Sequence, residues 1–108
     1  MDDQQFRDIA DRALTDLQRA LEKAAEGSDF DVDRKEGALT IEFEDPPGRF
    51  VVSPNTPVRQ VWVSALVKSF KLDWNEGKQD FVLPGDSRTL RQLISDVVSE
   101  QLGEKIRL

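Results

Sequence analysis

Hydrophobic positions recur at helical spacing over the first quarter of the chain. The apolar residues that share this spacing are Phe6, Ile9, Ala10, Ala13, Leu14, Leu17, Ala20, Leu21 and Ala24. They form a single stripe, which predicts a helix over residues 3–26. Asp2 or Asp3 is expected to cap its start, and Gly27 is expected to end it as a left-handed residue.

From residue 29 the period of the apolar positions changes to two, which is typical of strands with one buried face. "DFDVD" and "ALTIEFE" predict two strands joined by a hairpin turn at "KEGA". "DPPG" at 45–48 breaks the chain before a third strand, "RFVVS", and "PNTP" supplies another turn. "VRQVWVS", "FKLDW" and "QDFVLP" continue the pattern, so we expect about six consecutive antiparallel strands.

A second helix is predicted over residues 88–102, ended by Gly103. Its apolar stripe consists of Leu90, Leu93, Ile94, Val97, Val98 and Leu102. The tail "EKIRL" is expected to lie back between the two helices. The order helix, strands, helix, with no repeat and no linker, predicts one domain over residues 1–108. The fold class is α+β, a two-layer sandwich with both helices packed on one face of an antiparallel sheet.

Composition excludes several kinds of site. The chain has no cysteine and no histidine, so disulfides, zinc or haem ligation and imidazole-dependent triads are not expected. No stretch approaches the roughly 20 apolar residues of a membrane span. The start "MDDQQF" lacks the basic and apolar regions of a signal peptide. We therefore expect the protein to act where it is made, without a membrane partner.

Charge is distributed unevenly along the chain. Residues 1–45 carry 14 acids and 6 bases, whereas residues 46–108 carry 7 acids and 9 bases, for a net charge of -6. The acidity therefore belongs to the N-terminal part. Such a surface repels nucleic acid and attracts basic partners or hard cations.

Six acids gather where the first helix meets the first strand: Glu22, Glu26, Asp29, Asp31, Asp33 and Glu36. Like charges four apart on a helix, acids at a helix C-terminus and acids at alternate strand positions all cost stability. One interpretation is a solvated face that serves solubility; the other is an acidic ridge that docks a basic partner or binds cations. Carboxylates suit calcium, magnesium, manganese or iron, but those of a strand do not converge, so we expect weak and multiple binding.

A second candidate surface is centred on Trp62. If Val61 and Val63 face the core, then Gln60 and Trp62 point to the face of the sheet that the helices leave uncovered. An exposed tryptophan beside an amide has the character of a protein-interaction hot spot. The alternative is a tryptophan covered by neighbouring strand residues or long side chains.

Over almost its full length the chain resembles the frataxin family, the bacterial CyaY group included. The resemblance is carried by "FRDIADRAL", "DFDVD", "GALTIEFE", "GRFVVSPNTPVRQVWVS", the "LDW" after it, and "TLRQLISDVVSEQLGEKI". The pattern "TP..Q.W" followed by an aspartate-containing strand is fairly specific. One departure is that "ALVKS" replaces the glycine-containing loop that usually follows the tryptophan.

The resemblance implies an α-β sandwich with a role in iron-sulfur cluster assembly. It further implies weak binding of ferrous and ferric iron, and contact with a cysteine desulfurase and its scaffold protein. By position, the metal-binding ridge maps onto Asp3, Asp11, Glu22, Glu26, Asp29, Asp31 and Asp33. The partner-binding surface maps onto Glu22, Glu26, Asp29, Asp31, Asp33, Gln60 and Trp62.

The leading hypothesis is therefore an iron-binding regulator, a monomer in the absence of iron, that docks a cysteine desulfurase and modulates sulfur and iron delivery. It is not expected to be an enzyme; the resemblance allows ferroxidase activity, which the residues do not support. A bacterial cytoplasm is the expected compartment, with the mitochondrial matrix as the alternative for a processed form. The alternative function is a metal-independent acidic interaction module on the same fold.

Overall fold

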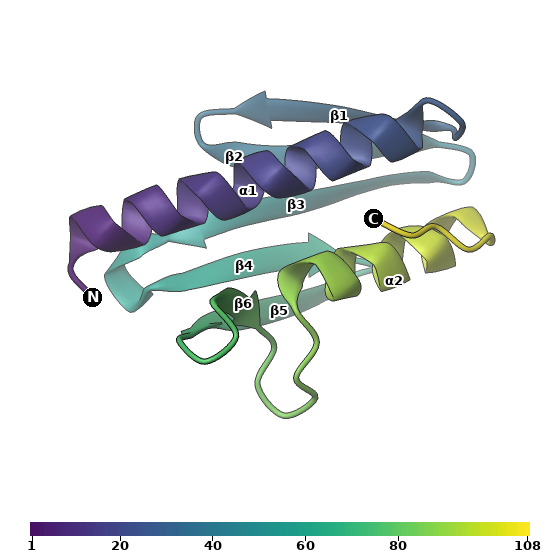
Figure 1. The fold of residues 1–108 in the computed structure, drawn as a ribbon. Helices are drawn as coiled ribbons and strands as arrows, with labels where there is room; N and C mark the ends of the chain where they lie inside the picture. The colour runs from purple at the N-terminus through teal and green to yellow at the C-terminus, as the bar shows by residue number, and fades with distance from the viewer.

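The structure, a computed structural model, describes all of residues 1–108 and contains two helices and a six-stranded sheet (Figure 1). In chain order the elements are α1 (Asp3–Ala25), β1 (Phe30–Lys35), β2 (Ala38–Glu44), β3 (Pro47–Asn55), a 3₁₀ turn (Thr56–Val58), β4 (Gln60–Ala65), β5 (Lys68–Asn75), β6 (Asp80–Val82) and α2 (Leu90–Leu102). The strands pair antiparallel in the order β1-β2-β3-β4-β5-β6. The predicted two-layer α+β architecture is confirmed, because both helices lie on one face of the sheet.

Helix α1 starts as predicted and ends differently. Asp2 is the N-cap, and it forms a capping box with Gln5, whose backbone N–H lies 2.8 Å from the Asp2 Oδ1. The prediction that Gly27 would end the helix as a left-handed residue is wrong, since Gly27 is not among the glycines with positive φ. The N–H groups of Glu26, Gly27 and Ser28 donate to carbonyls three residues earlier instead. This 3₁₀ turn satisfies the last carbonyls, so no left-handed residue is needed.

The strands follow the predicted alternation, with different bounds. Asp29 lies in the bend before β1, although we expected it within the first strand. Strand β3 extends beyond the predicted residues 49–53 at both ends, so the prolines of "DPPG" and "PNTP" partly belong to it. Pro47 is the first residue of the strand, a position that tolerates a residue without a donor N–H.

Helix α2 begins two residues later than expected, because Thr89 is its N-cap and forms a capping box with Gln92. Gly103 ends it in the left-handed region at φ 69°, as predicted. The tail then returns along the helix: the Ile106 N–H donates to the Ser99 Oγ at 2.8 Å, and the Leu108 N–H donates to the Ser95 Oγ at 3.3 Å. Leu108 reaches the groove that residues of both helices line, so the predicted position of the tail is confirmed.

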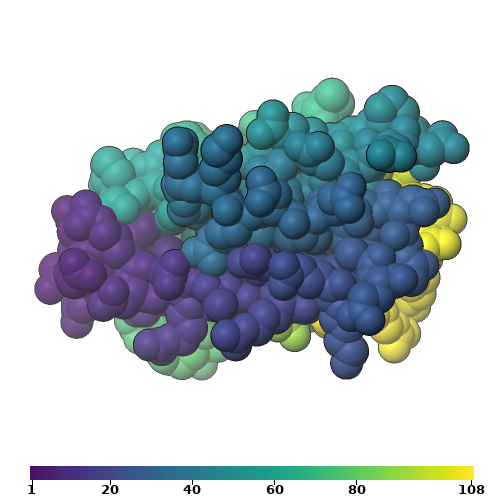
Figure 2. All heavy atoms as spheres, turned by 90° about the horizontal axis from the view of Figure 1, so that it is seen from above, coloured from purple at the N-terminus to yellow at the C-terminus, as the bar shows by residue number.

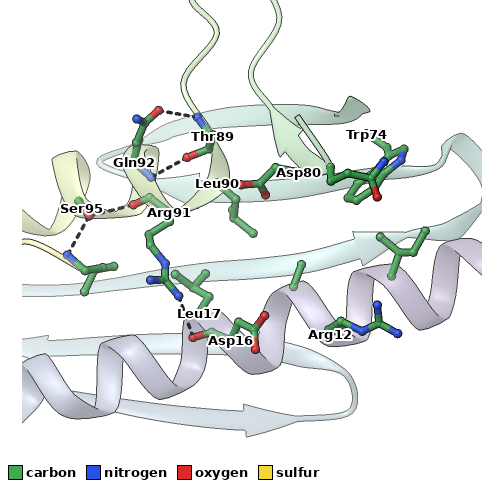
Figure 3. Close-up of a pocket in the computed structure, with 14 residues that line it drawn as sticks. Arg12, Asp16, Leu17, Trp74, Asp80, Thr89, Leu90, Arg91, Gln92 and Ser95 are labelled. Atoms are coloured by element: carbon green, nitrogen blue, oxygen red, sulfur yellow. Dashed lines mark hydrogen bonds between the residues drawn. The ribbon is translucent and has the colours of Figure 1, made fainter. Parts of the chain in front are cut away.

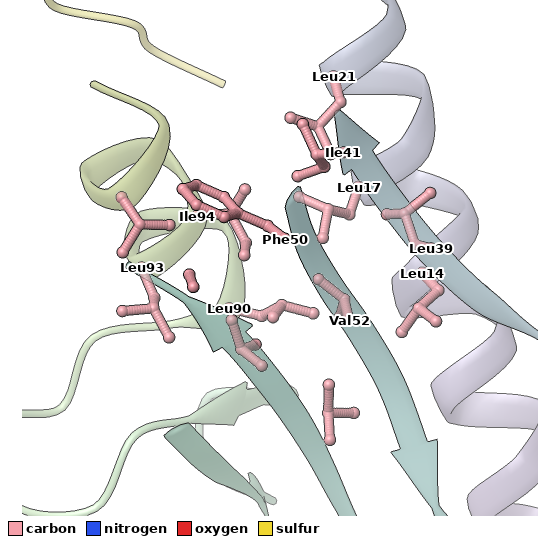
Figure 4. Close-up of a cluster of buried hydrophobic side chains, with 14 of the residues drawn as sticks. Leu14, Leu17, Leu21, Leu39, Ile41, Phe50, Val52, Leu90, Leu93 and Ile94 are labelled. Atoms are coloured by element: carbon pink, nitrogen blue, oxygen red, sulfur yellow. The ribbon is translucent and has the colours of Figure 1, made fainter. Parts of the chain in front are cut away.

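A single hydrophobic core fills the space between the helices and the sheet (Figure 4). Leu17 and Leu21 of α1, Ile94 of α2 and Phe50 of β3 meet there and are almost fully buried. Burying one such side chain stabilises the fold by roughly 1.5–3 kcal/mol, so this layer dominates the energetics. Neither helix has the length and apolarity that crossing a membrane would require.

Candidate protein-binding and metal-binding surfaces

The predicted acidic ridge lies along the edge of the molecule where α1 runs beside β1. Seen from above, α1 and the β1–β2 hairpin lie side by side (Figure 2). All seven predicted ridge acids are exposed. Asp3 and Glu22 lie about 28 Å apart along the helix at 1.5 Å per residue, so the ridge cannot act as one site.

Two of the seven ridge acids are neutralised by arginines from elsewhere in the chain. Asp11 forms an ion pair with Arg34 at 2.7 Å, and Asp3 forms one with Arg59 at 2.7 Å. The Arg34 side chain is only 19% exposed and also donates to Thr15. Sequence reasoning missed both pairs, because the partners are far apart in the chain.

The other five acids, which we call the acidic corner, surround the C-terminal end of α1 and the start of β1. They are Glu22, Glu26, Asp29, Asp31 and Asp33. None of them forms an ion pair. Asp31 lies opposite Glu42 of β2, which sequence reasoning did not include, although the alternation of "ALTIEFE" already predicts an outward Glu42. The acidic corner is therefore the part of the ridge that keeps its full negative charge.

The carboxylates of the ridge do not form a metal-binding cluster. No group of three or more histidine, cysteine, aspartate or glutamate residues is placed to hold one ion. Asp31 and Asp33 alternate along the same strand face, about 7 Å apart at 3.3 Å per residue, which is too far for one small cation to bind both directly. These residues therefore fit an ion held by one or two carboxylates and water.

The open face of the sheet carries Trp62. Val61 and Val63 are buried and Trp62 is 36% exposed, so the predicted orientation of this strand is confirmed. The Trp62 Nε1–H donates to Gln60 at 3.0 Å, and Gln60 donates to Asp73 at 3.0 Å. The Lys71 Nζ lies 4.8 Å from the centroid of the indole ring. Trp62 is thus partly covered by a lysine, between the two alternatives that the sequence left open.

The largest cavity, about 760 Å³, is a groove between the two helices (Figure 3). Arg12 and Asp16 of α1 line it together with Arg91 of α2 and Asp80 of β6, so its charges nearly balance. Burial raises the pKa of Asp80, while the Phe81 N–H and the nearby Arg91 and Lys78 oppose this shift. None of these residues belongs to the predicted sites.

Comparison with known proteins defines the class. The fold and the acidic edge describe a two-layer α-β protein suited to binding cations or basic proteins. The model of the frataxin-like domain matches residues 1–104, and the chain belongs to the frataxin family.

The relatives are bacterial. The chain is 32% identical to the iron-sulfur cluster assembly protein CyaY of Pseudomonas aeruginosa over 108 residues, covering 98% of this chain and 95% of that protein. It is 32% identical to CyaY of Azotobacter vinelandii over 95 residues, covering 86% of each chain. Its fold is similar to frataxin from Psychromonas ingrahamii, with a TM-score of 0.84, 24% identity and coverage of 99% and 97%. A trimeric frataxin from Saccharomyces cerevisiae matches with a TM-score of 0.73, 24% identity and coverage of 89% and 80%.

Proposed function

We propose that the protein is an iron-binding regulator of iron-sulfur cluster assembly that docks a cysteine desulfurase through its acidic corner. Its relatives are named as iron-sulfur cluster assembly proteins, which supports the pathway. The observation that carries the docking proposal is the acidic corner itself, which has five exposed carboxylates and no internal counterion. Repulsion among these groups is relieved when a basic protein surface covers them.

Iron is cargo rather than a resident cofactor in this proposal. The acidic corner offers only carboxylate oxygens, which suit hard ions, and no three of them converge. Iron would therefore bind weakly and exchange readily, held by Glu22, Glu26, Asp29, Asp31 and Asp33. Asp3 and Asp11, which the family resemblance also assigns to the ridge, would contribute less, because Arg59 and Arg34 already neutralise them.

Docking is tested by changing Asp29, Asp31 and Asp33 together to Asn and titrating the purified desulfurase of the same organism by calorimetry. We expect binding of this triple variant to be lost, and binding of the unmodified chain to weaken steeply with salt. The matched control changes Glu76, Glu100 and Glu104 to Gln, which removes the same charge away from the corner. Unchanged binding by the corner variant would show that the ridge is not the docking surface.

A metal-independent interaction module is the second candidate, favoured by the lack of a three-carboxylate cluster. Iron titration followed by NMR separates the two candidates. Shifts confined to residues 20–36 support iron binding at the corner. Spectra that do not change at near-millimolar iron would support the metal-independent module.

A further inference from the structure

The turn between β4 and β5 places an apolar residue in an unfavourable conformation. Leu66 and Val67 both have positive φ, 53° and 56°. This is the left-handed pair that a two-residue hairpin turn requires, and asparagine and glycine are the residues that tolerate it. A β-branched residue there is an outlier. Such strain persists only where other interactions hold the backbone, and outliers of this kind cluster at functional sites.

The two residues of this turn differ in their surroundings. Leu66 packs against the hydrophobic core and fixes the turn. Val67 is fully exposed, more so than any other large hydrophobic residue in the structure. The hairpin thus presents one apolar side chain to solvent at its tip, where a polar residue would be both less strained and better solvated.

Val67 and Trp62 belong to one continuous surface. Trp62 pairs with Lys71 across the hairpin, and Ser64 pairs with Ser69 between them and the tip. A cavity of about 190 Å³ lies along this hairpin, lined by Trp62, Val51 and Lys71 among others. An aromatic anchor, a cavity and an apolar tip surrounded by small polar residues form the arrangement of an interaction hot spot.

The charge of this surface is opposite to that of the acidic corner. Residues 46–72, which span β3, β4 and most of β5, contain no aspartate or glutamate. They contain four cations: Arg49, Arg59, Lys68 and Lys71. Lys68 directly follows the tip, and Lys71 lies over Trp62. A protein that covers this hairpin is favoured when it supplies carboxylates around an apolar pocket, whereas the acidic corner favours a basic partner.

We propose that Val67 and Trp62 anchor the hairpin in an apolar pocket, rimmed by carboxylates, on the second protein of the assembly complex. This rests on the proposed function and identifies that second protein as the scaffold, bound at the opposite edge of the chain from the desulfurase. Val67 is then a specificity-determining residue, and its strained conformation serves the projection of the side chain.

Binding of purified desulfurase alone and of the desulfurase–scaffold complex tests this proposal. Val67→Thr keeps the branched shape and the turn but removes the apolar surface. We expect it to bind the complex about tenfold more weakly, the effect of losing one buried aliphatic group, and to bind the desulfurase alone as the unmodified chain does. Val58→Thr, at another exposed valine, is the matched control and should change neither affinity.

Val67→Gly separates binding from folding. It relieves the backbone strain, so we expect higher thermal stability together with weaker binding of the complex. A merely structural role would not weaken binding. Charge reversal at Lys68 and Lys71 should weaken binding of the complex but not of the desulfurase alone.

The outcomes distinguish this inference from the proposed function. Full binding of the complex by Val67→Thr, with binding lost in the aspartate triple variant, would overturn the tip inference and leave the proposed function standing. If neither variant changes any affinity, both fail. A concentration-dependent dimer in light scattering that Val67→Thr dissociates would also overturn the inference, because the tip would then bind a second copy of the chain.

Discussion

The Arg34 guanidinium of β1 and the Asp11 carboxylate of α1 form an ion pair of 2.7 Å in which the arginine is mostly buried and the aspartate is exposed. Arg34 also donates to Thr15 of α1 at 3.0 Å. The pair therefore fastens the edge strand to the helix and removes one acid from the ridge. Because β1 has only one neighbouring strand, this contact is one of the few polar ties on its free side.

Arg34→Met should destabilise the protein. Methionine keeps much of the apolar stem but loses the hydrogen bonds to Asp11 and Thr15, so the free energy of unfolding should fall by about 1 kcal/mol. Urea denaturation measures this change. Arg49→Met is the control: Arg49 and Glu42 are both exposed and 4.0 Å apart, and such a pair contributes roughly 0–1 kcal/mol. Equal losses in the two variants would contradict a special role for Arg34.

Much of this structure follows from local sequence patterns, whereas the state of the ridge does not. The stripe containing Leu14, Leu17 and Leu21 predicts α1, and the alternation around Trp62 predicts which side chains leave the core. Local signals failed at Gly27, since a 3₁₀ turn satisfies the helix carbonyls there. The partners Arg34 and Arg59 were missed because ion pairing across 23 and 56 residues depends on how the elements pack. Sequence shows where charges lie along the chain, and tertiary contacts decide which remain free.

Changing Asp29, Asp31 and Asp33 together to Asn should raise stability. Asp31 lies directly opposite Glu42, and like charges facing each other across strands are destabilising. We expect a gain of about 1 kcal/mol, which raises Tm by roughly 4–8 °C in a domain of this size. Calorimetry at low and high salt measures it, and the gain should shrink as salt screens the repulsion. The triple change at Glu76, Glu100 and Glu104 is the control, and an equal gain there would point to net charge rather than to the corner.

Asp80→Asn and Asp86→Asn should change the pH dependence of stability in opposite directions. Burial raises the pKa of Asp80, so the folded state binds its proton more tightly than the unfolded state does. Stability is therefore lost as pH rises through the folded pKa, and Asp80→Asn should be more stable than the unmodified protein at pH 7. Asparagine keeps the oxygen that accepts the Phe81 N–H at 2.8 Å. This advantage should vanish in acid, below the unfolded pKa of about 4.

For Asp86 the sign is reversed. Its side-chain and backbone hydrogen bonds from Arg88 lower the pKa of the carboxyl, so its stabilising contribution is present above the unfolded pKa and is lost as pH falls through the folded pKa. Asp86→Asn should therefore be less stable than the unmodified protein at pH 7, with the difference disappearing in acid. Urea denaturation at several pH values measures both variants. If both shift stability in the same direction, the assigned causes are wrong.

Two hairpin turns with left-handed residues offer a reciprocal test of backbone strain. The β1–β2 turn has Glu36 and Gly37 at φ 54° and 82°, and the β4–β5 turn has Leu66 and Val67 at φ 53° and 56°. Val67→Gly should stabilise the fold by about 1 kcal/mol, because glycine adopts positive φ without the clash that a Cβ causes. Gly37→Val should cost a similar amount. A Cβ at Gly37 would meet no atom within 4 Å, so that cost would come from the backbone alone. Denaturant unfolding at one temperature measures both changes. If Val67→Gly destabilises the protein, the exposed valine makes a stabilising contact that outweighs the strain of its backbone.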